Sequence, residues 1–386
     1  MPRVYPFEGL LFDPAVAGPL EQVTAPPYDV IGEDARRRYL DASRYNVVRL
    51  DLPDRTDGGS LEAARDLLVS WRADGALVPS GESLFAYEMR FLLDGEERKV
   101  IGLLCALELE AWGGRVIPHE RVMPEPVEDR LALLRATRAN VSAIYGTIPG
   151  PYEPLKDLLE TVGDRPPLRA CDDEEGVRHR LWMVPAAAPI QDLIEDEPML
   201  IADGHHRYET ALRYRDERRA VDGPGPWDRA LALLVDAAIE RPPVLPFHRL
   251  LIGPAPAPGF GRRVRDLDEC LAALDDERVT FGSAGHEGAE LVHRVGELTG
   301  SPPTVRALHE QVLDRLARDG TTVRFTPDPR AAEDAVRDGT ASAAYFLPPT
   351  SAETIRAVID RGERLPQKST YFWPKPRTGI VIRPLS

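Results

Sequence analysis

Apolar residues recur at two spacings along the chain, and these spacings predict a mixture of helices and strands. Between residues 61 and 73 they recur every three or four positions, which indicates an amphipathic helix. Residues 84–92 and 99–109 resemble strands, and Asp94-Gly95 between them is typical of a hairpin turn. Further segments complete the prediction, with helices over 126–139, 207–219, 266–274, 287–298 and 304–318 and strands over 47–50, 142–148, 181–184, 199–202, 322–325 and 342–347. Because strands and helices alternate throughout, the predicted fold class is α/β, with α+β as the alternative.

Two stretches rich in proline and glycine, residues 149–151 and 253–261, interrupt this pattern. They predict three segments. Residues 1–150 would form the N-terminal α/β part of a core, 151–252 a second segment, and 262–386 a C-terminal α/β segment that packs on the core. A chain of 386 residues is long enough to bury a substantial core.

The charge balance excludes some classes of partner. Lys and Arg number 48 against 63 Asp and Glu, which gives a net charge of −15 and makes nucleic acids and anionic membranes poor partners. The sequence contains no apolar run of about 18 residues and no signal-peptide pattern, so we expect a cytoplasmic protein. Three cysteines without a CxxC pair fit a reducing compartment and argue against a structural zinc site. The sequence leaves the oligomeric state open.

The most informative motif follows the predicted strand 199–202, where the chain turns on Asp203-Gly204 into a helix. A helix start offers backbone N–H groups and the positive end of the dipole, which together bind anions. The cationic or titratable run from His205 to Arg207 opposes that dipole unless an anion is present. Gly204 would allow close approach of the ligand, and His206 and Arg207 would donate to phosphate. For Asp203 two roles stay open: an N-cap, or a ligand of Mg²⁺ beside a polyphosphate.

A second candidate motif is His119-Glu120-Arg121. The Glu120 carboxylate can accept a proton from an attacking hydroxyl, and Arg121 can balance charge on a transferring phosphoryl group. Met123 stands where the HExxH zinc motif would need its second histidine. The alternative interpretation is a solvent-exposed cluster of ion pairs on a loop.

Two further segments carry candidate ligand-binding groups. Pro26-Pro27 makes a rigid turn from which Tyr28 and Asp29 can reach a ligand, or else a stiff connector. Residues 367–375 contain two of the four lysines of the chain, and their polar side chains can close over a phosphate or an adenine-bearing ligand: Lys368, Ser369 and Thr370. Alternatively, the aromatic residues of this segment pack it onto the protein. Four other histidines lie in charged segments and are expected at the surface, namely His179, His286, His293 and His309.

The run from Gly204 to Arg207 resembles the phosphate-binding motif of the ParB/sulfiredoxin superfamily, which includes ParB nucleotidases, sulfiredoxin and an archaeal free serine kinase. Over nearly its full length the chain resembles an uncharacterised prokaryotic family, domain of unknown function 1015, in residues 25–30, 118–121, 128–130, 203–212 and 365–372. His205 stands where sulfiredoxin needs a cysteine, so sulfur chemistry is not implied. The sequence also lacks the basic helix-turn-helix region of ParB partition proteins. The resemblance implies a ParB/sulfiredoxin-like mixed core with additional α/β segments, and the free serine kinase is the closest characterised analogue.

This resemblance and the motifs together predict a phosphoryl-transfer enzyme, a nucleotide-dependent kinase or phosphatase acting on a small hydroxy metabolite such as serine or phosphoserine. ATP or ADP would bind with Mg²⁺ on Asp203. The expected catalytic residues are Glu120, His119, His205 and Asp203, and the expected nucleotide-binding residues are Gly204, His206, Arg207, Arg121, Lys368, Ser369 and Thr370. Two alternatives stay open: a non-catalytic, ParB-like nucleotide switch, and a metal-dependent hydrolase. The hydrolase is the more awkward one, because adjacent side chains diverge on a helix.

Overall fold

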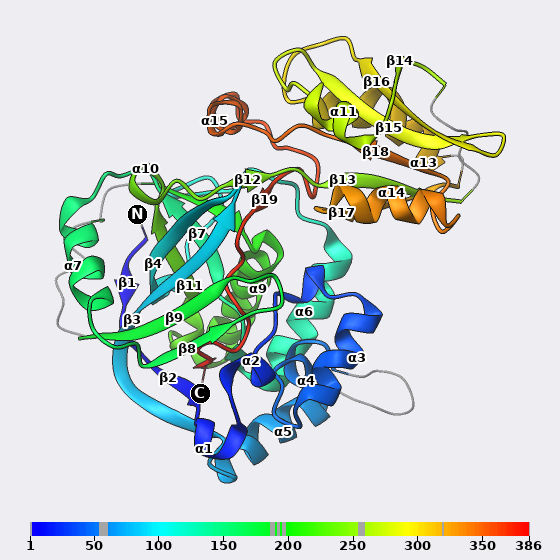
Figure 1. Cartoon of the computed structure of the whole chain (residues 1–386). Helices are drawn as coiled ribbons and strands as arrows, with labels where there is room; N and C mark the ends of the chain where they lie inside the picture. Colours follow the sequence, from blue (N-terminus) through cyan, green and yellow to red (C-terminus); the bar gives the residue numbers. More distant parts are fainter. Residues whose placement is uncertain are drawn as a thin grey trace. The chain divides into compact units, whose positions relative to one another are not determined.

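A computed structural model describes residues 2–53, 61–185, 190, 194, 198–253, 259–318 and 320–385. The fold is mixed α/β, as the sequence predicts (Figure 1). The chain forms two compact units, the first made of Met1–Pro118, Val122–Pro242 and Pro374–Ser386, and the second of His119–Arg121 and Pro243–Trp373. These boundaries differ from the three sequential segments expected above, because the chain leaves the first unit and later returns to it.

The first unit is built on one mixed sheet that has ten strands in the described part of the chain. Its strand order is β5 (Val116–Ile117), β10 (Met199–Asp203), β7 (Ile144–Ile148), β11 (Arg229–Asp236), β4 (Glu96–Glu108), β3 (Leu77–Leu93), β9 (Arg178–Pro185) and β8 (Arg169–Asp172), while β1 (Val4–Tyr5) pairs with β4 and β2 (Phe7–Phe12) with β3. The predicted hairpin is confirmed between β3 and β4. Its turn residues Asp94 and Gly95 have φ of 53° and 80°, the left-handed conformations that a tight two-residue turn requires.

Helices accompany the sheet of the first unit: α1 (Pro14–Ala17), α2 (Leu20–Val23), η1 (Tyr28–Val30), α3 (Glu33–Ala42), α4 (Val48–Asp51), α5 (Leu61–Ala73), α6 (Pro124–Thr137), α7 (Glu153–Gly163), α9 (His205–Asp222), η2 (Pro226–Asp228) and α10 (Ala237–Glu240). Helix α5 has the bounds that its apolar spacing predicts. The predicted strand over 47–50 is wrong, because α4 lies there. Asn46 starts this helix, since its Oδ1 accepts a hydrogen bond from Val48 N at 2.9 Å.

The core of the first unit fixes the turn between β10 and α9. Ile201 of β10 and Leu234 of β11 belong to one buried cluster with Leu155 of α7 and Tyr208 of α9. Both the strand that enters the turn and the helix that leaves it are therefore anchored by apolar packing.

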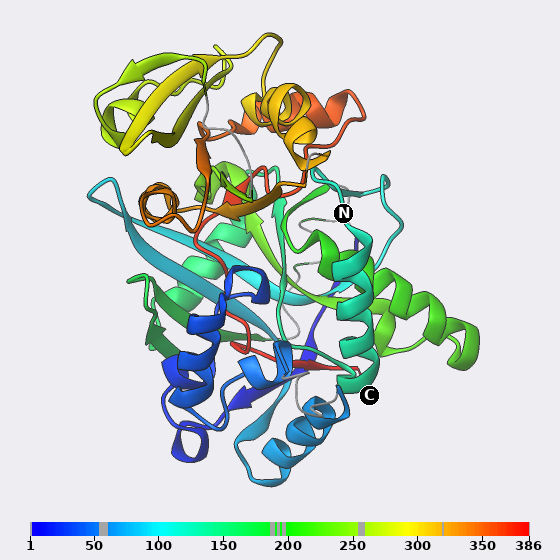
Figure 2. The ribbon, with the colours of Figure 1, turned by 90° about the vertical axis from the view of Figure 1, so that its right-hand side faces the viewer.

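The last residues of the chain, red in Figure 2, run through the first unit. Thr378 pairs with Ala25, Ile382 pairs with Leu10, and β20 (Arg383–Pro384) pairs with β6 (Ala139–Asn140). This C-terminal segment, residues 374–385, thus joins three parts of the unit that are remote from it in sequence.

The second unit has a six-stranded antiparallel sheet in its described part, in the order β14 (Arg262–Val264), β16 (Glu290–Glu297), β15 (Thr280–Glu287), β18 (Ala343–Phe346), β13 (His248–Ile252) and β17 (Thr322–Thr326). Its helices are α11 (Leu267–Ala272), α12 (Thr304–Leu308), the π-helical turn η3 (His309–Leu313), α13 (Asp314–Arg318), α14 (Pro329–Arg337) and α15 (Ala352–Asp360), and a small sheet pairs β12 (Val244–Leu245) with β19 (Tyr371–Phe372). The predicted helix over 287–298 is wrong. Strand β16 lies there and pairs with β15 through a turn at Gly288, whose φ is 65°.

Two of the histidines expected at the surface are buried. His179 is 0% exposed and its Nε2 lies 2.9 Å from Asp173 Oδ2, while His293 is 6% exposed and lies 2.7 Å from Glu333. For His179 the carboxylate of Asp173 is the hydrogen-bond partner that burial of an imidazole requires, while Glu333 lies at ion-pair distance from His293. The described helices include none that combines the length and the apolar character needed to cross a membrane.

Candidate functional site

The turn between β10 and α9 has the geometry of an anion-binding helix start. Gly204 is the N-cap residue of α9, with φ of 96°, and no side chain caps the helix there. Of the two roles open for Asp203, capping is therefore not the one it adopts. Its carboxylate instead contacts two cations, Lys375 Nζ at 2.6 Å from Oδ1 and Arg207 Nη2 at Oδ2.

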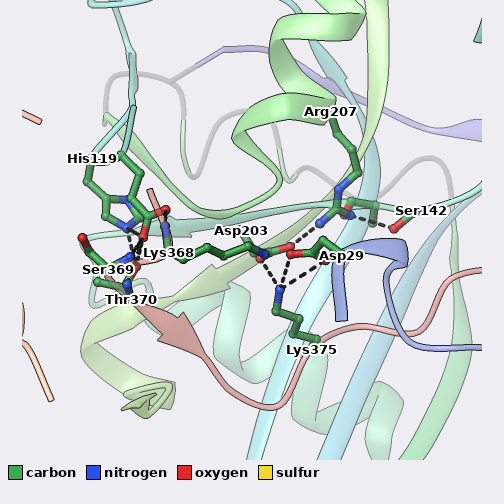
Figure 3. A network of polar contacts seen from close by, with 11 residues as sticks. Asp29, His119, Ser142, Asp203, Arg207, Lys368, Ser369, Thr370 and Lys375 are labelled. Carbon is green, nitrogen blue, oxygen red and sulfur yellow. Dashed lines mark hydrogen bonds and ion pairs between the residues drawn. The ribbon is translucent and has the colours of Figure 1, made fainter. Parts of the chain in front are cut away.

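Arg207 lies folded back across the start of its own helix (Figure 3). Its Nη1 donates to Ser142 Oγ at 2.7 Å and to the carbonyl of Ala143, in the segment that leads into β7. Its buried Nε has no hydrogen-bond partner among the described residues. A Cβ placed on Gly204 would lie 3.0 Å from that Nε, so the glycine also provides the space in which the guanidinium lies. The unused N–H beside an uncapped helix start is suited to donate to a phosphate oxygen.

Lys375 completes this cluster from the C-terminal segment. Its ammonium lies 3.2 Å from Asp29 as well as 2.6 Å from Asp203, and the side chain is only 4% exposed. Two carboxylates and two cations thus balance each other at the start of α9. The sequence predicts a ligand-binding role for Lys368, but Lys375, the second lysine of residues 367–375, is the one that contacts Asp203. We name Asp29, Asp203, Arg207 and Lys375 the charge cluster.

His205 and His206 occupy the first turn of α9 in different ways. His205 is buried, at 7% exposure. His206 accepts a hydrogen bond at Nε2 from the backbone N–H of Met123, 3.1 Å away, just before α6 begins. In this arrangement Nε2 carries no proton and the ring is neutral with its proton on Nδ1, so His206 connects the starts of α9 and α6 through Nε2.

A small cavity inside the first unit shares Arg207 with the charge cluster. Its volume is about 60 Å³, and its walls include Tyr28, Asp51, Arg130, Ser142 and Arg207. Arg130 Nη1 lies 3.1 Å from Asp51 Oδ1, and its guanidinium lies 4.3 Å from the centre of the Tyr28 ring. Burial raises the pKa of Asp51, although the positive charge of Arg130 opposes the shift. Sequence reasoning missed Asp51, because it placed a strand before it instead of the helix that carries it.

The second predicted motif lies in the second unit, where Glu120 binds the loop of residues 368–370. Its carboxylate accepts hydrogen bonds from three consecutive backbone N–H groups, at 3.0 Å from Lys368, 3.0 Å from Ser369 and 2.9 Å from Thr370. The hydroxyl of Thr370 donates to it as well, at 2.8 Å. Two motifs that are 248 residues apart in sequence and were identified independently are therefore in contact.

The groups around Glu120 define its electrostatic surroundings within the second unit. His119 is fully buried and its Nε2 lies 2.7 Å from Thr370 Oγ1. Burial lowers the pKa of Arg249 to about 9, and the negative charge of Glu120 opposes the shift. The Lys368 ammonium lies 5.1 Å from the centre of the Phe247 ring, a cation–π contact. The backbone N–H of Arg121 donates to Leu365 O at 3.1 Å.

The predicted site residues thus form two clusters, one in each unit. The first unit holds Asp203, Gly204, His205, His206 and Arg207, and the second holds His119, Glu120, Arg121, Lys368, Ser369 and Thr370. In the described part of the chain, no group of three or more His, Cys, Asp or Glu side chains is arranged to hold a metal ion.

Comparisons with known proteins give a family match and weak structural similarities. The model of a family described as "Protein of unknown function (DUF1015)" matches residues 4–299. None of the curated proteins matches the chain. The solved structure of a free serine kinase in complex with AMP is similar with a TM-score of 0.39 and 14% identity, over 67% of this chain and 83% of that chain. A conserved hypothetical protein from Pyrococcus furiosus gives 0.38 and 14% over 68% and 90%, and SbnI with C-terminal truncation from Staphylococcus aureus gives 0.35 and 10% over 71% and 85%.

Proposed function

The chain belongs to the DUF1015 family of proteins of unknown function, and we propose that it is a phosphoryl-transfer enzyme that uses a nucleotide. One observation carries the proposal. Arg207 and Lys375, from segments far apart in sequence, both contact Asp203 at the uncapped start of α9. Two cations beside exposed backbone dipoles provide what a nucleotide phosphate needs. The resemblance of this turn to the ParB/sulfiredoxin motif supports the same interpretation.

We propose ATP or ADP as the nucleotide, with its terminal phosphates at the start of α9. Arg207 would donate through its unused Nε, and Lys375 would supply a compact positive charge. Asp203 and Asp29 fit a Mg²⁺ ion that arrives with the nucleotide, because Mg²⁺ prefers one or two carboxylates together with phosphate oxygens. Bound there, the ion would neutralise charge on the phosphates.

In the kinase direction, the oxygen of a small hydroxy compound would attack the terminal phosphorus and the bond to the ADP oxygen would break. The hydroxyl proton would pass to a carboxylate of the same site. If water instead of a hydroxy compound attacks the phosphorus, the same residues would serve a phosphatase. Serine or phosphoserine is the small substrate that the resemblance suggests.

Calorimetric titration with ATP, ADP and CTP tests the proposal. Replacement of Arg207 by Ala should raise the dissociation constant of the preferred nucleotide at least about tenfold, because it removes a charged donor from the site. Arg213→Ala is the matched control. Arg213 lies on the same helix, but it is 39% exposed and pairs only with surface carboxylates, so binding should stay within about twofold. Equal binding by wild type and Arg207→Ala would remove the start of α9 from the mechanism.

Mass spectrometry of reaction mixtures then distinguishes an enzyme from a switch. A kinase gives a phosphorylated small molecule from ATP, and a phosphatase gives the dephosphorylated one. Nucleotide binding that changes the oligomeric state without any product would favour the non-catalytic switch instead.

A further inference from the structure

Lys375 is held in a backbone segment that cannot easily adjust. Pro374 and Pro376 flank it, so two fixed φ angles surround the lysine and the residue before each proline is restricted to extended conformations. Residues two apart on an extended chain project to the same side. Anchoring of Arg377 therefore restricts where the backbone of Lys375 can lie.

Arg377 is bound in a buried socket on the first unit. The side chain is 2% exposed, its Nε donates to Thr24 Oγ1 at 2.8 Å, and its Nη2 donates to Thr24 O at 2.9 Å. Its Nη1 lies 3.2 Å from Glu174 and 3.7 Å from Asp173. The adjacent Thr378 N donates to Ala25 O at 2.8 Å. The socket thus joins Lys375 to the segment that leads to Asp29.

A closed chain of three hydrogen bonds and one ion pair holds the backbone of Arg377 as well. Its N–H donates to the hydroxyl of Tyr87 at 3.1 Å, and Tyr87 Oη lies 2.7 Å from His179 Nδ1. His179 Nε2 lies 2.9 Å from Asp173 Oδ2, and Asp173 faces the guanidinium of Arg377 again. Each donor of these hydrogen bonds has an acceptor if Tyr87 donates to a neutral His179 and that ring donates to Asp173. The chain therefore begins and ends on Arg377.

We propose that Arg377 is a positioning residue that holds Lys375 against Asp29 and Asp203. Arg377 is not part of the charge cluster, yet it lies two residues from Lys375, is almost fully buried, and directs every donor group to a neighbour. A positioning role accounts for these contacts. A flexible segment would leave the lysine ammonium free to occupy several positions. The socket instead fixes the backbone on the C-terminal side of Pro376. The consequence for ligand binding rests on the proposed function, but the placement of Lys375 does not.

Amine labelling tests the placement directly, because the chain contains only four lysines and fragment spectra assign the label to each of them: Lys99, Lys156, Lys368 and Lys375. In the wild type, Lys375 should react slowly with an acetylating reagent, since it is nearly buried between two carboxylates. Arg377→Met should accelerate the labelling of Lys375 about tenfold or more and leave the exposed Lys99 unchanged as an internal reference. Arg377→Lys and Thr24→Val remove fewer contacts and should give intermediate rates.

Arg383→Met is the matched control. Arg383 is buried in the same C-terminal segment and donates to backbone carbonyls, but it makes none of the contacts of the socket. It should lower the free energy of unfolding without accelerating the labelling of Lys375. The inference is overturned if Lys375 keeps its wild-type rate in Arg377→Met, or if Arg383→Met accelerates it equally.

Titration with ADP separates the two proposals. If both are right, Lys375→Met and Arg377→Met each raise the dissociation constant about tenfold, and the double variant adds no more than about twofold because both act through one ammonium. If labelling responds as expected while neither variant changes ADP binding, the positioning role stands and the proposed nucleotide site fails. If Lys375→Met weakens binding but Arg377→Met does not, the positioning role fails alone.

Discussion

Gly204 tests the structural reasoning about the start of α9 most directly. Its φ of 96° belongs to the left-handed region, and an added Cβ would lie 3.0 to 3.1 Å from three atoms of the Arg207 guanidinium. Replacement by Ala therefore has two separate effects. The first is the cost of a left-handed conformation for a residue with a Cβ, about 1–2 kcal/mol.

The second effect is displacement of Arg207. That guanidinium donates to Ser142, Ala143 and Asp203, so even a small shift weakens hydrogen bonds to a charged donor, each of which contributes about 1.5–3 kcal/mol. Loss of one such bond together with the backbone term gives a total of about 2.5–5 kcal/mol. Gly176 provides the matched control, since its φ is 77° and nothing lies within 4 Å of a Cβ placed there. Gly176→Ala should cost only the backbone term.

Urea denaturation of both variants measures the difference, and titration with ADP shows whether the displaced guanidinium matters for binding. Gly204→Ala should be less stable than Gly176→Ala by about 1.5–3 kcal/mol and should bind ADP more weakly. Equal losses of stability, with ADP binding unchanged in both variants, would refute the close approach of Arg207 to Gly204 and its role in the site.

Three further changes test other parts of the structure. Asp203→Asn should lower the free energy of unfolding by about 2–4 kcal/mol in urea denaturation, because it leaves Lys375 and Arg207 without their shared carboxylate; a loss under 1 kcal/mol would contradict the charge cluster. Glu120→Gln should lower the free energy of unfolding by about 1–3 kcal/mol, because the carboxylate that accepts from three backbone N–H groups of residues 368–370 becomes a neutral amide, and unchanged stability in urea denaturation would contradict that contact. Burial lowers the pKa of His179, so the unfolded chain binds a proton before the folded one as pH falls below about 6.5, and stability is lost in that direction. His179→Gln should reduce the slope of stability against pH by up to about 1.4 kcal/mol per pH unit below pH 6.5, and identical slopes would contradict a buried neutral ring.

Local patterns in the sequence predicted those parts of the fold that local physics determines. The hairpin at Asp94-Gly95 and the helix over 61–73 required only a turn signal and an apolar spacing. The segments 47–50 and 287–298 were assigned the wrong element because their apolar residues fit both periods, and the deciding contacts lie elsewhere. For the first these are a cap from Asn46, and for the second the partner strand β15.

The candidate site shows the same division. The turn at 203–207 and the contact of Glu120 with residues 368–370 involve segments that the sequence identified one by one. The sequence does not determine which of the two lysines in residues 367–375 contacts Asp203. That contact depends on how residues 374–385 pair with segments from the start and middle of the chain. Asp51 was missed for a similar reason. A carboxylate in an apolar run can be recognised as part of a site only when its contact with Arg130 is known.

The threading of residues 374–385 has a consequence for biosynthesis. A ribosome releases the whole of Pro243–Trp373 before it makes the segment that pairs with Leu10, Ala25 and Asn140. During translation the earlier part of the first unit therefore lacks its contacts with residues 374–385, which have a very large sequence separation, until that segment is made. Lys375 and Arg377 follow that long insertion, so a nascent chain would complete its charge cluster only after Pro243–Trp373 has been made.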